Sequence, residues 1–165
     1  MRVFLYFNIF IRHVSNMADY KITETMYADH LRIERMLKNM SRGSIDDYRD
    51  FKRFKWELER HIFVEERAIF SMLNDKRYNQ NKEIMSVLEE HDKILQHLHD
   101  KEHEMRRRGT ANLAELSRML EKHKRTEDEV IYPALDRGLN EDQRWEIISR
   151  IHREIKGMQD NSDKE

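Results

Sequence analysis

The sequence of 165 residues contains no cysteine, a single proline and only four glycines. Without cysteine the chain can form no disulfide, and it has neither a thiolate metal ligand nor a cysteine nucleophile. The scarcity of helix breakers, together with many Glu, Lys, Arg, Leu and Met residues, favours long helices over sheets. The sequence therefore predicts an all-α protein.

An excess of charge of either sign is also missing. The chain has 31 Lys and Arg against 32 Asp and Glu, a formal net charge of −1, which gives no argument for nucleic acid or an anionic membrane as partner. Its apolar run at residues 3–11 (VFLYFNIFI) is too short to span a bilayer, which takes about twenty helical residues. We expect a cytoplasmic protein with no membrane and no nucleic-acid partner.

The division of the chain into domains follows from its length and its ends. Residues 1–16 form a leader that lacks a signal cleavage site. It is either an over-extended start, with Met17 as the natural alternative, or an extra element lying on the domain. We expect one domain at residues 17–160, long enough to bury an apolar core, and a frayed tail at residues 161–165.

Apolar residues at intervals of three and four predict five helices. The first is expected at about residues 23–40, and the second runs from a cap at Ser44 to Met72. The third is expected at 82–107, and the fourth runs from a cap at Thr110 to a kink or end at Tyr132. The fifth begins after a cap at Asn140. The interruption at Tyr132 follows from Pro133, whose ring would clash with the carbonyl group of Glu129. Short links imply antiparallel neighbours, so we predict an up-down-up-down four-helix bundle with an additional C-terminal helix.

Two of these helices carry a histidine and a glutamate within their apolar stripes. His61 and Glu65 lie on the second helix, and His123 and Glu127 lie on the fourth. Four residues advance about 400° around a helix, so both members of each pair lie on one face. The stripe of the fourth helix is expected to continue through Val130 without a change of spacing.

The first and third helices each add a single histidine to this pattern. His30 and His91 precede the two pairs by nearly the same number of residues, and Ile follows each of them at the third position. The two helical hairpins therefore resemble copies related by an approximate two-fold axis.

Six residues at core positions thus repeat one spacing, namely His30, His61, Glu65, His91, His123 and Glu127. A single core histidine is more often a packing residue than a ligand, but an unpaired buried carboxylate is costly. We therefore predict a metal site at these six residues. Imidazole and carboxylate without thiolate suit iron, manganese or zinc. Two bridging Glu and two His on each metal would leave positions for an oxo bridge, water or a small ligand.

The Glu-x-x-His motif of ferritin-like di-iron proteins is absent, because no His has a Glu three residues before it. The series His30, His61-x-x-x-Glu65, His91 and His123-x-x-x-Glu127, followed by IYPAL, instead resembles the hemerythrin-like (HHE cation-binding) domain over residues 23–157. The resemblance implies a four-helix bundle around two iron ions in an oxo- and carboxylate-bridged centre. It also implies a role in oxygen carriage, in oxygen or iron sensing, or in repair of damaged iron–sulfur clusters.

Two departures from the oxygen carriers of this family bear on function. Carriers have a fifth His four residues after that of the third helix, where this chain has Leu95. They also use an Asp five residues after the His of the fourth helix, where this chain has Asp128 beside Glu127. By spacing alone, either acid could bridge the two metals, whereas the apolar stripe favours Glu127. Repair-type proteins have four His and two Glu, as here, but commonly add a Cys-containing segment that this chain lacks.

We therefore predict a di-iron protein whose centre reacts with O2, NO or peroxide in redox sensing or stress protection, for which a protein redox partner would be suitable. The alternatives are iron donation in iron–sulfur cluster repair, reversible oxygen binding, which Leu95 argues against, and a structural bundle holding zinc. Whether the protein is an enzyme is left open. Glu34, one turn after His30, would either reach the metals or face solvent.

Overall fold

The computed structural model describes residues 21–42, 48–73 and 81–162, and these ranges contain helices and no strand. The four main helices are α2 (Ile22–Arg42), α3 (Tyr48–Val64), α5 (Lys82–Arg108) and α6 (Ala114–Thr126). Short elements extend α3 and α6, and α8 (Glu141–Ser162) follows them. The predicted leader and the predicted cap at Ser44 lie outside the described residues.

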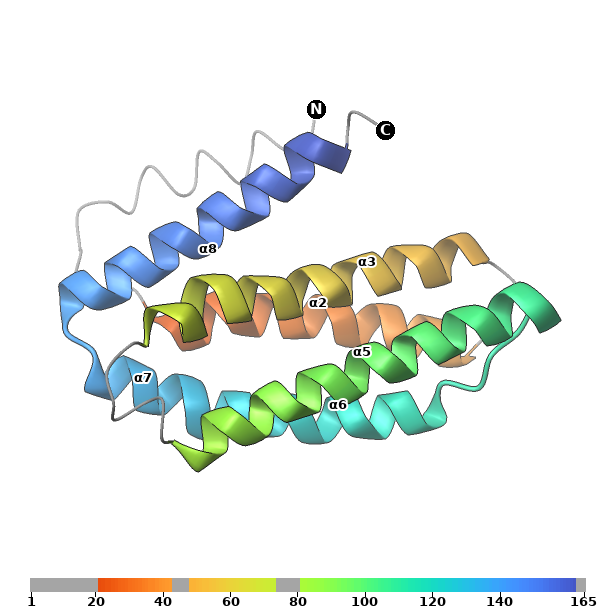
Figure 1. The fold of residues 1–165 in the computed structure, drawn as a ribbon, viewed down its shortest axis with the longest axis horizontal. Coiled ribbons are helices and arrows are strands. Elements are labelled where there is room, and N and C mark those ends of the chain that lie inside the picture. Colours follow the sequence, from red (N-terminus) through yellow and green to blue (C-terminus); the bar gives the residue numbers. More distant parts are fainter. Residues whose placement is uncertain (1–20, 43–47, 74–80, 163–165) are drawn as a thin grey trace.

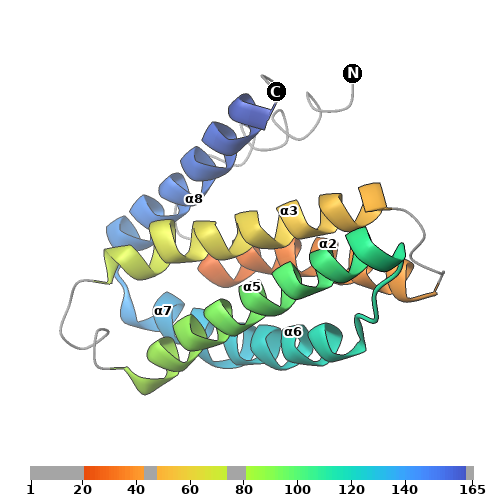
Figure 2. The ribbon, with the colours of Figure 1, turned by 45° about the vertical axis from the view of Figure 1, so that its right-hand side comes forward.

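The main helices form an antiparallel bundle in which each contacts two neighbours. Helix α2 packs on α3, α3 on α5, α5 on α6, and α6 back on α2 (Figure 1). Helix α8 leaves the bundle axis at an angle and packs on α2 and α3 (Figure 2). The predicted four-helix bundle with an additional C-terminal helix is confirmed. Within the described residues, no helix combines the length and the apolar character needed to cross a membrane.

The ends of α5 follow from its flanking residues. The side chain of Asn81 accepts hydrogen bonds from the backbone amides of Glu83 and Ile84, which caps the first turn. At the other end Gly109 adopts φ 76°, a left-handed conformation that costs glycine little, and its amide donates to the carbonyl of Met105. The third helix was predicted to end at about residue 107, and α5 ends at Arg108.

The cap predicted from the sequence is wrong for α6 and correct for α8. Thr110 was the predicted cap of the fourth helix, which is wrong: α6 begins at Ala114, whose amide donates to the side chain of Asn112. Asn140 and Gln143, in contrast, bond each other's backbone amides through their side chains. This is the reciprocal capping arrangement expected from their spacing.

Both helices with a His and Glu pair widen into a π-helical turn that begins at the glutamate: η2 (Glu65–Ile69) and η4 (Glu127–Ile131). A π turn holds one more residue than an α turn, so it shifts the buried face by one position. The predicted continuation through Val130 was therefore wrong. Val130 is 46% exposed, whereas Ile131 is 3% exposed.

The interruption predicted at Pro133 is present. Helix α6 ends at Thr126, and after η4 a new α-helix, α7 (Tyr132–Gly138), begins with Pro133 in its first turn. A proline is tolerated there because the first amides of a helix have no partner within it.

Two apolar clusters fill the bundle, one on each side of a polar layer. The first lies towards α8 and contains Ile22, Met26, Val64, Ala68, Ile69, Phe70, Leu73, Ile84, Val87, Ile131, Tyr132, Leu135, Leu139, Ile147, Ile148 and Ile151. The second contains Ile33, Leu37, Met40, Phe51, Phe54, Leu58, Ile62, Ile94, Leu98, Met105, Leu113, Leu116 and Leu120. Trp145, on α8, is 53% exposed and belongs to neither cluster.

Candidate metal centre

The polar layer between the two apolar clusters consists of the six residues singled out by the sequence. Each of the elements α2, α3, α5 and α6 supplies one histidine, and η2 and η4 supply one glutamate each: His30, His61, His91, His123, Glu65 and Glu127. None of the six is more than 5% exposed. The fold therefore brings together side chains that lie far apart in the sequence.

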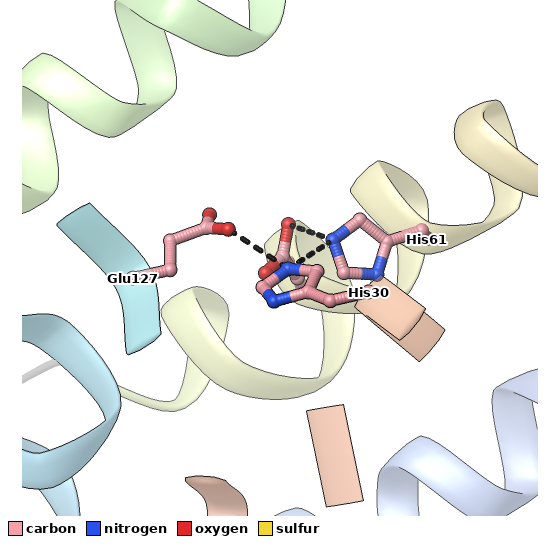
Figure 3. A group of neighbouring side chains, drawn as sticks. His30, His61 and Glu127 are labelled. Atoms are coloured by element: carbon pink, nitrogen blue, oxygen red, sulfur yellow. Dashed lines mark hydrogen bonds and ion pairs between the residues drawn. The ribbon is translucent and has the colours of Figure 1, made fainter. Parts of the chain in front are cut away.

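On one side of the layer, His30 and His61 face each other and the glutamates. The Nε2 atom of His30 lies 3.1 Å from Nε2 of His61 and 3.2 Å from Oε2 of Glu127. Nε2 of His61 lies 3.4 Å from Oε2 of Glu65. Figure 3 shows the two imidazoles turned towards one another, with the carboxylate of Glu127 extending towards His30.

The other side repeats this arrangement with His91 and His123. Nε2 of His91 lies 3.2 Å from Oε2 of Glu65 and 3.6 Å from Oε1 of Glu127. Nε2 of His123 lies 3.0 Å from the same Glu127 oxygen. Each side thus offers four ligand atoms within 4.8 Å of one another, and both glutamates belong to both groups. Two cations could be held here, with the carboxylates shared between them.

Several buried atoms of this layer make no hydrogen bond: Glu65 Oε2, His91 Nε2, His123 Nε2 and both carboxylate oxygens of Glu127. Buried polar atoms are nearly always hydrogen-bonded, because leaving one without a partner costs the free energy of its desolvation. Five such atoms that all face one small volume fit bound cations, whose positive charge would satisfy them together. The donor set of imidazoles and carboxylates suits metals of this kind.

The outward-facing nitrogen of each imidazole lies near a further acid, which we call its outer carboxylate. On the first side, Nδ1 of His30 lies 2.8 Å from Oδ1 of Asp128. Nδ1 of His61 lies 3.9 Å from Oδ2 of Asp29, too far for a hydrogen bond but close enough for a charge contact. Burial opposes the ionisation of Asp29, but His61 and the buried Arg60 lower its pKa to about 2.

The second side has the same arrangement. Nδ1 of His91 lies 3.0 Å from Oε1 of Glu66, and Nδ1 of His123 lies 3.3 Å from Oε2 of Glu90. A carboxylate on the outer nitrogen keeps the proton there, which leaves the lone pair of Nε2 pointing into the site. Asp128 therefore acts on His30 from outside, whereas Glu127 lies in both ligand groups.

The sequence analysis missed three of the four outer carboxylates and treated Asp128 only as a rival ligand. A signal for them exists, because each is the immediate neighbour of a residue in the site. They form the dipeptides Asp29-His30, Glu65-Glu66, Glu90-His91 and Glu127-Asp128. Adjacent residues on a helix point in different directions, so each acid meets the imidazole of a neighbouring helix and not that of its own.

The charges of this layer shift several pKa values. Burial alone would lower the pKa of His30, but its hydrogen bond with Asp128 and the nearby carboxylate of Glu127 raise it to about 10. Burial would also lower the pKa of His91, but the neighbouring carboxylates of Glu127, Glu65 and Glu66 raise it to about 11. Despite the complete burial of Glu127, the surrounding imidazoles hold the pKa of its carboxyl well below the usual range. The raised pKa values of His30 and His91 favour their protonated forms beside these carboxylates.

Tyr132, in the first turn of α7, is a further functional residue that the sequence analysis did not identify. Its side chain is fully buried, its hydroxyl donates a hydrogen bond to Oε1 of Glu65, and its ring stacks on His30 with 5.9 Å between centroids. Burial and the neighbouring Glu127 and Glu65 carboxylates raise its pKa well above the ordinary value. The hydroxyl group therefore keeps its proton and orients Glu65.

Glu34, the weaker candidate, lies outside both ligand groups. Its carboxylate pairs with Lys38 of the same helix at 2.8 Å and with Lys124 of α6 at 2.7 Å. The sequence left open whether Glu34 reaches the metals or faces solvent, and these ion pairs favour the position at the surface.

Comparison with known proteins agrees with this geometry. No curated protein and no solved structure matches the chain. The family model described as the hemerythrin HHE cation-binding domain matches residues 21–135, most of the chain and all six residues of the polar layer. The chain belongs to the hemerythrin HHE cation-binding domain family.

Proposed function

We propose that the six residues of the polar layer hold two iron ions, with Glu65 and Glu127 shared between them. The observation that supports this most strongly is the division of the six into two groups of four that have both glutamates in common. A single cation would leave two imidazoles without a role. Two cations use every unpaired atom that faces the layer.

Iron is the metal that best combines this donor set with reactivity. The ligands would be imidazole and carboxylate, and the chain has no thiolate to offer. Two imidazoles and two shared carboxylates would not complete a six-coordinate sphere, so each iron would keep room for a small molecule. Iron bound in this way would supply one-electron redox chemistry and a place for a small molecule.

We further propose that the centre reacts with O2, NO or peroxide, and that the protein serves in redox sensing or stress protection. The chain's own contribution is to hold the imidazoles through the outer carboxylates, to orient Glu65 through Tyr132, and to place an apolar cluster on each side of the layer. Reversible oxygen carriage is disfavoured because Leu95 stands where carriers have a fifth imidazole, and it packs against the second apolar cluster.

Rapid mixing of the reduced, iron-loaded protein with each small molecule tests this proposal. We expect a change in visible absorption with O2, NO or peroxide, and oxidation by O2 that is not reversed when the gas is removed. A colour that disappears under vacuum and returns with oxygen would support a carrier instead. The absence of a reaction with all three molecules would refute the proposed function.

A further inference from the structure

A cavity of about 540 Å³ lies between α2, α3 and α6, next to the candidate metal centre. Its walls include four buried apolar side chains of the second cluster, Ile33, Leu37, Leu58 and Leu120. The imidazoles of His30, His61 and His123 also line it. The cavity therefore extends from the candidate ligands towards the surface.

The cavity is larger than the small molecules of the proposed function require. A diatomic molecule needs about the space of one water molecule, some 30 Å³. The observed volume instead falls within the range of about 300 to 1,000 Å³ that is usual for sites binding small organic molecules. Access for oxygen alone does not explain a space of this size.

The rim of the cavity carries charges that cancel. Lys38 and Lys124 both lie on it, and both pair with the carboxylate of Glu34, at 2.8 and 2.7 Å. Glu121 is the fourth charged residue of the rim. These two positive and two negative side chains give the rim no net charge. Beyond them, the apolar walls would strip water from a charged ligand without replacing its hydrogen bonds.

We propose that this cavity binds a small, uncharged and mainly apolar organic molecule beside the metal centre. The placement of this molecule beside metal ions rests on the proposed function. The apolar walls of the cavity do not depend on it. His30, His61 and His123 line the same end of the cavity, so a polar group on the ligand would face this end. The apolar part would lie along Leu37, Leu58 and Leu120.

Naphthalene is a suitable probe, and naphthylmethylammonium is a charged counterpart that cannot bind a metal. In equilibrium dialysis with the full chain, we expect saturable binding of one naphthalene per protein, at least about tenfold tighter than that of naphthylmethylammonium because of the cost of burying a charge. Absence of saturable naphthalene binding, or equal affinity for naphthylmethylammonium, would refute the proposal.

A cavity-filling variant locates the binding. Ser117 lines the cavity and is half-buried, so Ser117→Trp should occupy the space and reduce naphthalene affinity at least about tenfold. Ser86→Trp, at an exposed position of α5 outside the cavity, is the matched control and should bind as the natural chain does. Leu37→Phe provides a second filling variant if Ser117→Trp does not fold. Unchanged binding in a folded filling variant would contradict the assignment.

Comparison of two metals separates this proposal from the proposed function. Proton resonances of bound naphthalene should broaden in the iron-loaded protein but not in the zinc-loaded protein, because paramagnetic broadening requires proximity. Naphthalene binding to a chain that takes up no iron would refute the proposed function and support the cavity site. Iron uptake without naphthalene binding would refute the cavity site and support the proposed function.

Discussion

At the residue scale, each imidazole of the centre is held between two acids of different kinds. Its Nε2 atom faces a glutamate of the site, and its Nδ1 atom faces an outer carboxylate. The outer acids fix which nitrogen keeps its proton, and they increase the basicity of the nitrogen that would bind the metal. The two acids at positions 127 and 128 therefore have different roles.

Asp128→Asn tests this difference. Because Asp128 faces His30 from outside, its loss should weaken iron binding about 10- to 100-fold without abolishing it. Competition with a coloured chelator measures the affinity, and Glu129→Gln at the exposed neighbouring position is the control. If Asp128→Asn abolished iron binding while Glu127→Gln retained it, Asp128 would be the ligand.

The raised pKa values of His30 and His91, about 10 and 11, predict how stability depends on pH in the metal-free protein. Their ordinary value is 6.5, so both histidines bind protons more tightly in the folded state. The stabilisation is complete below about pH 6.5 and is lost as pH rises through about 10 to 11. Denaturant unfolding across this window should show decreasing stability, with a smaller decrease in His30→Gln. A rise in stability with pH would contradict the assignment.

At the element scale, the two π turns determine which side chains enter the core beyond each glutamate. The sequence predicted the helices and their order, and it singled out the six residues that the fold brings together, because spacing of three and four depends on local geometry alone. It did not reveal the π turns, since an extra residue in one turn leaves the preceding stripe unchanged. It also placed a helix cap at Thr110, although the side chain of Asn112 is the one that accepts the amide hydrogen bond.

The shift in register can be measured by truncating two adjacent residues. Ile131→Ala should lower the free energy of unfolding by about 2 to 4 kcal/mol, because Ile131 is buried in the first apolar cluster. Val130→Ala should change it by less than about 0.5 kcal/mol, since that side chain is 46% exposed. Urea unfolding of both variants provides the comparison. A larger effect at Val130 would show that the helix continues as a regular α-helix.

At the scale of the whole molecule, the polar layer separates the two apolar clusters of the bundle. Its buried charges are costly without a cation, and under the proposed function only the assembled layer would bind one. Metal binding should therefore stabilise the fold. With free metal at about 100 times the dissociation constant, the gain is about 2.7 kcal/mol.

Removal of the metal should then lower the melting temperature by about 5 to 10 °C for a chain of this size. Thermal unfolding before and after chelation, followed by circular dichroism, measures the change, and restored metal should reverse it. Equal melting temperatures in both states would show that the polar layer does not couple metal binding to folding.

The central claim is that two iron ions share Glu65 and Glu127, and metal analysis of protein purified without oxygen tests it most directly. The account predicts two irons per chain in the natural protein and loss of iron in the Glu65→Ala, Glu127→Ala double variant. The variant's far-ultraviolet circular dichroism should still show a helical fold. Full iron content in the double variant, or a natural protein that holds only zinc and has no visible absorption, would contradict the account.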